Sequence, residues 1–475
     1  MKSFVFVWLI FISSVSFGGQ AQLQDLLDKN QYKAALTQWN EFYPTEKSKN
    51  VPGVQALYSF VLFRNGLHVL ALENLFLIKK VKDIPSGIQK AWANELVPSH
   101  PVLKKITLTW NNHWNGFFSK NTEFKIRAWN THSLDNKKDI KDAQELLAKV
   151  DLSSEESAWL RWQLALGFGI IGQTSKASGL LQQLLDSEQQ LIDHDQILMA
   201  AARMLYQDNK LDKSLRYYNL ISKNSDYWLE ALEEKAWIYT RSKQYEKALA
   251  ELTTVLTPFF ASQLGPEPYF LASFDNLKIC DYNSIFKIIV EFKKRYRSRV
   301  VEIERLAHSG TSPEVTKALA KLQNGYVSLA TLGPDVEKLP RFFNRDEILL
   351  RQITREKYLS EEVSVATKLE ISEVIKTAKA HLDISKTEIT KKIKLMAKVD
   401  MSEISKNLQK LQIVEVEAIQ RMHANPKKSD EDKSFQKITD NNVIEFPYRD
   451  EIWLDELDHY QVNAKGCPAK EGKKL

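Results

Sequence analysis

The residues best suited to chemistry lie near the C-terminus, in the stretch EFPYRDEIWLDELDHYQV at positions 445–462. Within it, Glu456 and His459 have the Glu-x-x-His spacing that places a carboxylate and an imidazole on adjacent turns of a helix, as di-metal sites use. Such a site needs a second pair of this kind, and none of the chain's other histidines, nine in total with His459, supplies one. We therefore interpret the acids as a solvated flank, and we expect no metal site, no cofactor and no catalytic residue.

A second motif could bind a nucleotide. Gly167, Gly169 and Gly172 spell G-x-G-x-x-G in the sequence GFGIIG. A dinucleotide fingerprint needs a strand before the glycines and a helix that opens within them. The preceding sequence SAWLRWQLAL has its bulky residues at helical spacing instead, so we expect the glycines at the end of one helix and in the turn that follows.

The large apolar side chains of the C-terminal stretch indicate docking rather than catalysis. Trp453, Leu457 and Tyr460 fall on one stripe of a helical wheel, and Phe446 precedes them. Buried aromatic residues of this size commonly anchor interfaces. We expect Phe446, Trp453, Leu457 and Tyr460 to dock a short C-terminal helix on the chain's own repeats, on its long helices or on another protein.

A basic run, KKRYRSR at positions 293–299, could bind an anion. Its five cations are Lys293, Lys294, Arg295, Arg297 and Arg299. One interpretation is a site for lipid headgroups, a cell-wall polymer or an acidic peptide. The other is favourable placement of cations at the C-terminus of a helix that begins near residue 284, where the macrodipole favours positive charge.

The first 21 residues have the features of a secretory signal peptide. Lys2 precedes an apolar run that is too short to span a bilayer, and small residues follow it. We expect an exported chain, most simply periplasmic, without a transmembrane segment and without a nucleic-acid partner. Outside the cytoplasm, the chain's two cysteines, Cys280 and Cys467, are free to form a disulfide; the alternative is two unpaired thiols.

Composition favours an all-α fold. The 475 residues include only 16 Gly and 14 Pro, and apolar residues recur at i, i+3, i+4 and i+7 spacing. The segments LDKSLRYYNLI and YEKALAELTTV align without gaps, with Leu211 and Tyr245 in matching places 34 residues apart. Small residues at Ser214 and Ala248 would let neighbouring helices approach closely.

This period resembles the tetratricopeptide repeat, which implies an α-solenoid of helical hairpins over residues 22–297. Looser copies of the second helix of the repeat lie at residues 30–42, 65–78, 137–150, 172–185 and 280–296. Residues 85–135 fit no register, although Trp110, Trp114, Phe117 and Phe118 are typical of a buried helix.

The second half of the chain predicts longer helices. No Gly or Pro occurs between Pro340 and Pro426. The apolar stripe of this segment comprises Ile389, Ile393, Met396, Ile404, Leu408 and Leu411. We expect a helical hairpin or coiled coil over residues 298–424, a linker over 425–443 and a docking tail over 444–475.

This layout is similar to that of repeat proteins attached to envelope machines for gliding motility, secretion or outer-membrane assembly. The resemblance implies a non-enzymatic scaffold or adaptor that binds segments of other envelope proteins in the groove of its repeats. The alternative is an exported module that binds an anionic cell-wall or surface polymer through the basic run.

Overall fold

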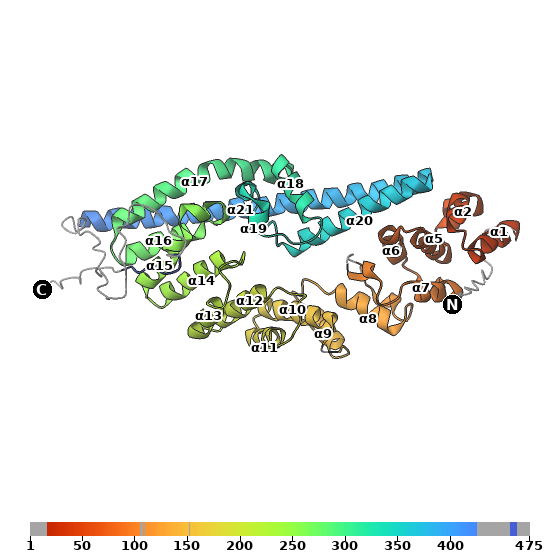
Figure 1. Ribbon diagram of the computed structural model, residues 1–475, viewed down its shortest axis with the longest axis horizontal. Helices are drawn as coiled ribbons and strands as arrows, with labels where there is room; N and C mark the ends of the chain where they lie inside the picture. Colours follow the sequence, from red (N-terminus) through yellow and green to blue (C-terminus); the bar gives the residue numbers. More distant parts are fainter. Residues whose placement is uncertain (1–16, 105–107, 109, 152, 425–456, 463–475) are drawn as a thin grey trace.

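The computed structural model describes residues 17–104, 108, 110–151, 153–424 and 457–462. Over these residues the chain forms α-helices and short 3-10 helices and no strand, which confirms the predicted all-α fold. The expected linker and most of the signal peptide and tail lie outside the described residues. Consecutive helices pack as hairpins along an elongated body (Figure 1).

The helices of the solenoid-like part are α1 (Phe17–Asp28), α2 (Tyr32–Thr37), α3 (Trp39–Phe42), α4 (Glu46–Lys49), α5 (Pro52–Arg64), α6 (His68–Phe76), η1 (Val81–Asp83), α7 (Ser86–Glu95), η2 (Pro101–Lys104), η3 (Asn112–Trp114), α8 (Lys120–Trp129), α9 (Lys137–Leu147), α10 (Glu155–Ile170), α11 (Thr174–Leu185), α12 (His194–Gln207), α13 (Leu211–Tyr218), α14 (Trp228–Arg241), α15 (Tyr245–Val255), η4 (Pro258–Gln263) and α16 (Glu267–Lys278). The remaining helices are α17 (Tyr282–Ser309), α18 (Pro313–Leu322), α19 (Leu329–Leu332), η5 (Pro334–Lys338), α20 (Glu347–Leu369) and α21 (Ser372–Ala424).

Six of the hairpins share one turn. In each, a residue with positive φ lies two positions before the second helix; these residues are Asn30, Gly66, Gly172, Asn209, Lys243 and Cys280. The next residue donates its N–H to the carbonyl five residues back, as Gln244 does to Tyr239 at 2.8 Å. This is the hydrogen bond of a Schellman motif, which satisfies a carbonyl at the end of the first helix.

The second helices of these hairpins lie close to their partners because they carry a small residue on the packed face. The residue five positions after the positive-φ residue is fully buried in every case, and it is small in five of them: Ala35, Ala71, Ala177, Ser214 and Ala248. Helices α13 and α15 begin at Leu211 and Tyr245, the two residues that the 34-residue period aligns. The predicted helical hairpins are therefore confirmed at these positions.

Helix α17 carries the chain out of the solenoid without a break. It runs for 28 residues, so the boundary predicted between residues 297 and 298 falls inside it. The basic run consequently lies in the middle of a helix. Its interpretation as charge at a helix C-terminus is wrong, because α17 ends at Ser309, where only His308 is basic in the last turn.

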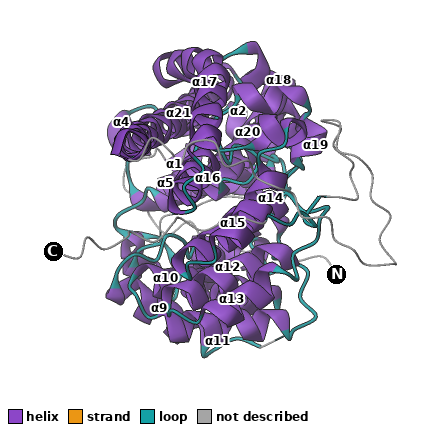
Figure 2. Cartoon of the chain, turned by 90° about the vertical axis from the view of Figure 1, so that its left-hand side faces the viewer, coloured by secondary structure: helices purple, strands orange, loops and turns teal. Residues whose placement is uncertain are grey.

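The long helix α21 closes the fold by contacting both ends of the solenoid. Near its start, Val374 and Ala378 join the core cluster of α5 and α6. Near its end, Leu411 and Val414 join that of α16 and α17, including Phe292. The first half of the predicted apolar stripe packs in a cluster with α17, α18 and α20, and the second half packs with α16 and α17. Viewed end-on, α17 and α21 lie together on one side and α9–α13 on the other (Figure 2).

Residues 85–135 leave the repeat pattern because much of the segment is not α-helix. The expectation of a buried helix around the aromatic residues is wrong for Trp114, which ends the 3-10 helix η3, and for Phe117 and Phe118, which lie between helices. These three side chains are nevertheless buried, and Trp114 packs on Phe76 with ring centroids 4.7 Å apart.

Two glycines offer a matched test of this packing. Gly310 follows the last residue of α17 with φ +71°, and an added Cβ would lie 2.6 Å from the carbonyl oxygen of Thr390 in α21. We expect Gly310→Ala to lower the free energy of unfolding by about 2–4 kcal/mol, from left-handed strain and overpacking. In Gly179→Ala, inside α11, the new Cβ meets nothing within 4 Å. We expect this variant to raise the free energy of unfolding by about 0.5–1 kcal/mol. Urea denaturation of both variants checks the pair.

Candidate functional site

The three glycines of the GFGIIG motif lie at the end of a helix and in the turn that follows it. Gly167 and Gly169 lie in the last turn of α10, and Gly172 is the positive-φ residue of the following turn, as the sequence predicts. A Cβ on Gly167 would lie 2.7 Å from the side chain of Leu134, and one on Gly169 would lie 2.8 Å from that of Met204. The backbone oxygen of Leu134 also lies 2.8 Å from a Cβ at Gly167, so that position has no room for a side chain, whereas at Gly169 the end of the flexible Met204 side chain would have to shift.

The basic run does not present five cations to one ligand. Arg299 is buried and paired with Asp400 at 2.6 Å, and its guanidinium also donates to the carbonyl oxygen of Leu339 at 3.2 Å. Arg295 lies over the ring of Tyr296, and Lys293 is 3.5 Å from Glu415 of α21. An anion arriving from solvent would meet Lys294 and Arg297, which are exposed, together with Lys293.

Of the Glu-x-x-His pair, only His459 is described, and its side chain is exposed. Glu456 lies outside the described residues. Among the residues that the structure describes, no group of three or more His, Cys, Asp or Glu side chains is arranged to hold a metal ion. Within the same residues, no helix has both the length and the apolar character to cross a bilayer.

Cys280 is disulfide-bonded, and it occupies the positive-φ position of the turn between α16 and α17. Cys467 lies outside the described residues, so its pairing with Cys280 stays a prediction. We expect peptide mapping by mass spectrometry without reduction to recover these two cysteines in one linked species. Reduction is then expected to lower the free energy of unfolding by about 2–5 kcal/mol, because the bond closes a long loop.

The described part of the tail, residues 457–462, lies against the repeats formed by α12–α16. Leu457 is 5% exposed and joins the core cluster that contains Leu232 of α14 and Val255 of α15. Tyr460 packs against the same cluster, and Val462 packs against the next one, which includes Leu252. Phe446 and Trp453, the other expected anchors, lie outside the described residues.

The segment is not helical there. Leu457 and Asp458 form a turn in which Asp458 has φ +69°, and residues 459–462 have no regular secondary structure. From His459 to Val462, exposed and half-buried side chains alternate, a period of two that is typical of extended chain. The helical stripe expected through Leu457 and Tyr460 is therefore not formed by these residues, and the repeats contact an extended segment instead.

Polar contacts hold this segment at its turn. The Asp458 N–H donates to Oγ1 of Thr254 at 2.8 Å, and Lys223 Nζ donates to the Leu457 carbonyl oxygen at 3.2 Å. Thr254 lies in the last turn of α15 and is fully buried, so its hydroxyl would lack this partner without the segment. Such main-chain hydrogen bonds are how extended peptides are commonly recognised.

Beside the turn, one lysine faces two carboxylates. Lys235 of α14 is nearly buried, 2.9 Å from Glu251 of α15 and 3.5 Å from Asp458. Burial raises the pKa of Glu251 to about 7; Lys235 opposes the rise and the neighbouring Asp458 carboxylate adds to it. A hydrogen bond between the Glu251 and Asp458 carboxyl groups also raises the pKa of Glu251, because two carboxyl groups can share a hydrogen bond only while one of them is protonated.

This raised pKa predicts a pH dependence. A carboxyl whose pKa is 4.5 when unfolded and about 7 when folded stabilises the fold fully below pH 4.5 and loses that contribution as the pH rises through 7. Between pH 4.5 and 8 the loss should reach up to about 3 kcal/mol. The measurement is the difference in unfolding free energy between wild type and Glu251→Gln across this range. A difference that does not change with pH would contradict the assignment.

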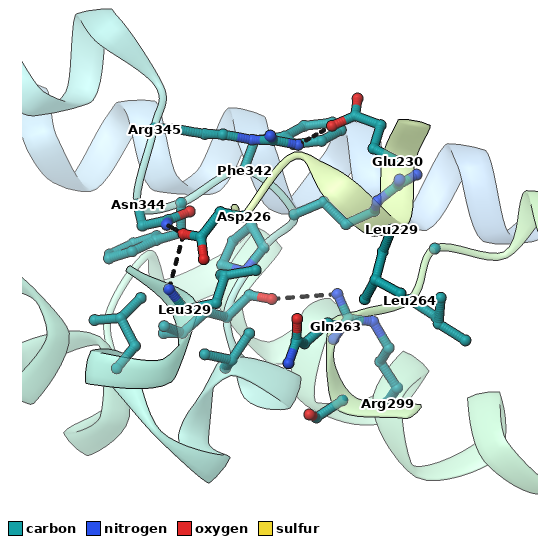
Figure 3. A pocket seen from close by; sticks show the side chains of 18 of the residues that line it. Asp226, Leu229, Glu230, Gln263, Leu264, Arg299, Leu329, Phe342, Asn344 and Arg345 are labelled. Carbon is teal, nitrogen blue, oxygen red and sulfur yellow. Dashed lines mark hydrogen bonds and ion pairs between the residues drawn. The ribbon is translucent and has the colours of Figure 1, made fainter. Parts of the chain in front are cut away.

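A second polar cluster joins α14 to the segment that precedes α20, around a cavity of about 70 Å³ (Figure 3). Asp226 accepts hydrogen bonds from the Leu329 N–H and the Asn344 amide, both at 2.9 Å. Glu230 pairs with Arg345 and, at 2.5 Å, with Arg203. These hydrogen bonds and ion pairs connect α14 and Asp226, which precedes it, to the segment before α20 and to α12, so this cluster serves to fix α14 within the fold.

A larger cavity of about 860 Å³ lies between α6, α10, α20 and α21. Exposed aliphatic side chains border it: Leu77, Ile170, Ile348 and Ile384. Its charged residues pair with one another, as Arg355 does with Glu73 at 2.6 Å. Nothing in the described residues covers this opening.

Sequence reasoning named Leu457 and Tyr460 but missed the residues that receive them. Thr254, Lys235 and Lys223 lie on separate elements, and no spacing in the sequence connects them to the tail. Comparison with known proteins adds no assignment, because no protein-family model and no curated protein matches the chain.

Proposed function

We propose that the chain is a non-enzymatic scaffold that binds segments of other proteins on the surface of its tetratricopeptide-like repeats. In this proposal it is exported, resides in the periplasm and takes part in a cell-envelope assembly. The signal-peptide features of residues 1–21 and the 34-residue period support the location and the class.

The observation that carries the proposal is the contact between α12–α16 and residues 457–462. This surface binds the segment through three contacts. It buries Leu457, it accepts a hydrogen bond from the main-chain N–H of Asp458, and it places Lys235 beside the Asp458 carboxylate. A surface that meets these three requirements for its own chain has the chemistry to bind a segment of another protein.

The test is crosslinking in intact native cells, followed by identification of the proteins that co-purify with the full chain. Thr254→Val combined with Lys223→Ala removes two recognition contacts, and we expect it to reduce partner recovery at least tenfold. Recovery of no envelope protein by the wild-type chain would contradict the proposal, as would unchanged recovery by the double variant.

A second candidate function is binding of an anionic cell-wall or surface polymer. It is supported by the exposed Lys294 and Arg297 on α17 and by exposed lysines on α21, such as Lys391, Lys398 and Lys406. The charge reversal Lys294→Glu with Arg297→Glu separates the two functions. It should abolish co-sedimentation with a polyanion such as dextran sulfate if this candidate is correct, and it should leave a scaffold's partner recovery unchanged.

A further inference from the structure

The segment 457–462 contacts the repeats in the way a bound peptide would, although it belongs to the same chain. Its contacts are spaced along it: Leu457 is the buried anchor, Asp458 faces Lys235, and Val462 is a second aliphatic contact five residues after the first. The intervening His459 and Gln461 are exposed and contribute little selectivity.

Among the residues that the structure describes, the fit of this segment to the surface is incomplete at two places. Beside Val462, a cavity of about 210 Å³ is lined largely by aliphatic side chains, among them Leu249, Leu252, Leu256 and Ile288. At the turn, Asp458 brings its carboxylate next to that of Glu251, and the two share one lysine. A void loses dispersion contacts, and the Asp458 carboxylate, which contributes to the raised pKa of Glu251, repels Glu251 once that group is ionised.

A segment that is held in place by its own chain tolerates such defects. Attachment gives it an effective concentration at the surface on the order of millimolar, so it remains bound with weak contacts of its own. A free segment that fills the cavity gains contacts that the tail lacks and can displace it.

We propose that residues 457–462 are a resident competitor that covers the repeat surface until a partner segment of similar chemistry replaces them. The partner segment has a leucine followed by an acidic residue and, five positions after the leucine, an aliphatic side chain larger than valine. This inference rests on the proposed function, since it names the class of partner segment and its control at the same surface.

The specificity follows from the contacts. Leucine suits the position of Leu457, which is almost fully buried among the aliphatic and aromatic residues of α12–α15. The acid is selected by Lys235, and the larger aliphatic side chain by the cavity next to Val462. A basic residue in place of the acid would face Lys235 at close range and be rejected.

The test measures binding of labelled ten-residue peptides to the purified full chain by fluorescence anisotropy. One peptide has the sequence of residues 455–464, a second carries Val462→Leu and a third carries Asp458→Lys. The chain is compared as wild type, as the opened variant Leu457→Ala/Val462→Ala, and as the matched control His459→Ala, which changes an exposed residue of the same segment.

We expect the opened variant to bind the first peptide at least tenfold more tightly than wild type and His459→Ala do. The Val462→Leu peptide should bind about three- to tenfold more tightly than the first, because one added methylene enters the cavity. The Asp458→Lys peptide should bind at least tenfold more weakly. Circular dichroism and the midpoint of denaturation of each chain show whether the variants fold.

Equal binding of the first peptide to wild type and to the opened variant would overturn the competitor role, and so would failure of the folded opened variant to bind. A wild-type chain that is dimeric through exchanged tails would also overturn it, because the occupant would then be a second copy. Failure of the proposed function looks different: the peptides bind as expected, but crosslinking in cells recovers no envelope protein.

Discussion

Replacing Asp400 with alanine is expected to lower the free energy of unfolding by about 3–5 kcal/mol, because it leaves a buried guanidinium without its counter-ion. Asp400 of α21 is 2% exposed and Arg299 of α17 is 6% exposed, and the two groups are 2.6 Å apart. Arg299 also donates to the carbonyl oxygens of Glu337 and Leu339, so the pair ties α17 and α21 to the segment between them. Guanidinium denaturation monitored by circular dichroism measures the loss.

The same two helices provide the control. Lys293 of α17 is exposed and pairs at 3.5 Å with the half-buried Glu415 of α21, and Glu415→Ala should lower the free energy of unfolding by less than about 1 kcal/mol. Replacing both buried partners, as in Arg299→Met/Asp400→Leu, should recover most of the stability lost in Asp400→Ala, since no uncompensated charge remains. If Asp400→Ala lowered the free energy of unfolding by less than Glu415→Ala does, the buried pair would not be what holds the helices together.

The second large effect is expected for Trp114→Ala, which should lower the free energy of unfolding by about 3–5 kcal/mol. Trp114 is fully buried, with ring centroids 4.7 Å from Phe76 and 5.0 Å from Phe117. Its removal leaves a cavity where the irregular segment after α7 joins the first repeats. Thermal and denaturant unfolding of the purified variant measure the cost.

Trp110 is the matched control, because it lies in the same irregular segment, is only half-buried and contacts Phe76 with ring centroids 6.0 Å apart. Trp110→Ala should lower the free energy of unfolding by less than half as much as Trp114→Ala does. Equal costs for the two variants would contradict the assignment of Trp114 to the core.

The features that could be predicted from the sequence are those that depend on local residue spacing. The scarcity of Gly and Pro indicated helices, and the 34-residue period aligned Leu211 with Tyr245, which begin equivalent helices. The shared turn was harder to recognise, because its positive-φ position holds glycine in two hairpins and asparagine, lysine or cysteine in the other four. Because several residue types adopt this backbone conformation, no single residue type in the sequence marks the turn.

Features that depend on distant contacts could not be predicted from the sequence. The partners of Arg299 lie in two later segments, so the basic run did not reveal that this arginine is buried. The tail was expected to be helical from the spacing of its apolar residues. The structure instead gives residues 457–462 a turn followed by non-helical chain, in which the Asp458 N–H donates to Thr254 and Val462 meets a different cluster from Leu457.

The central claim is that the surface of α12–α16 binds an extended segment, and amide hydrogen exchange of the full chain tests it most directly. The account predicts that the Asp458 amide and the C-terminal turn of α15 exchange at least tenfold more slowly in wild type than in Leu457→Ala/Val462→Ala, because the first amide is bonded to Thr254 and the segment covers the turn. Adding the peptide of residues 455–464 to the variant should restore protection of α15. Identical exchange of α15 in the two chains, with no effect of the peptide, would contradict the account.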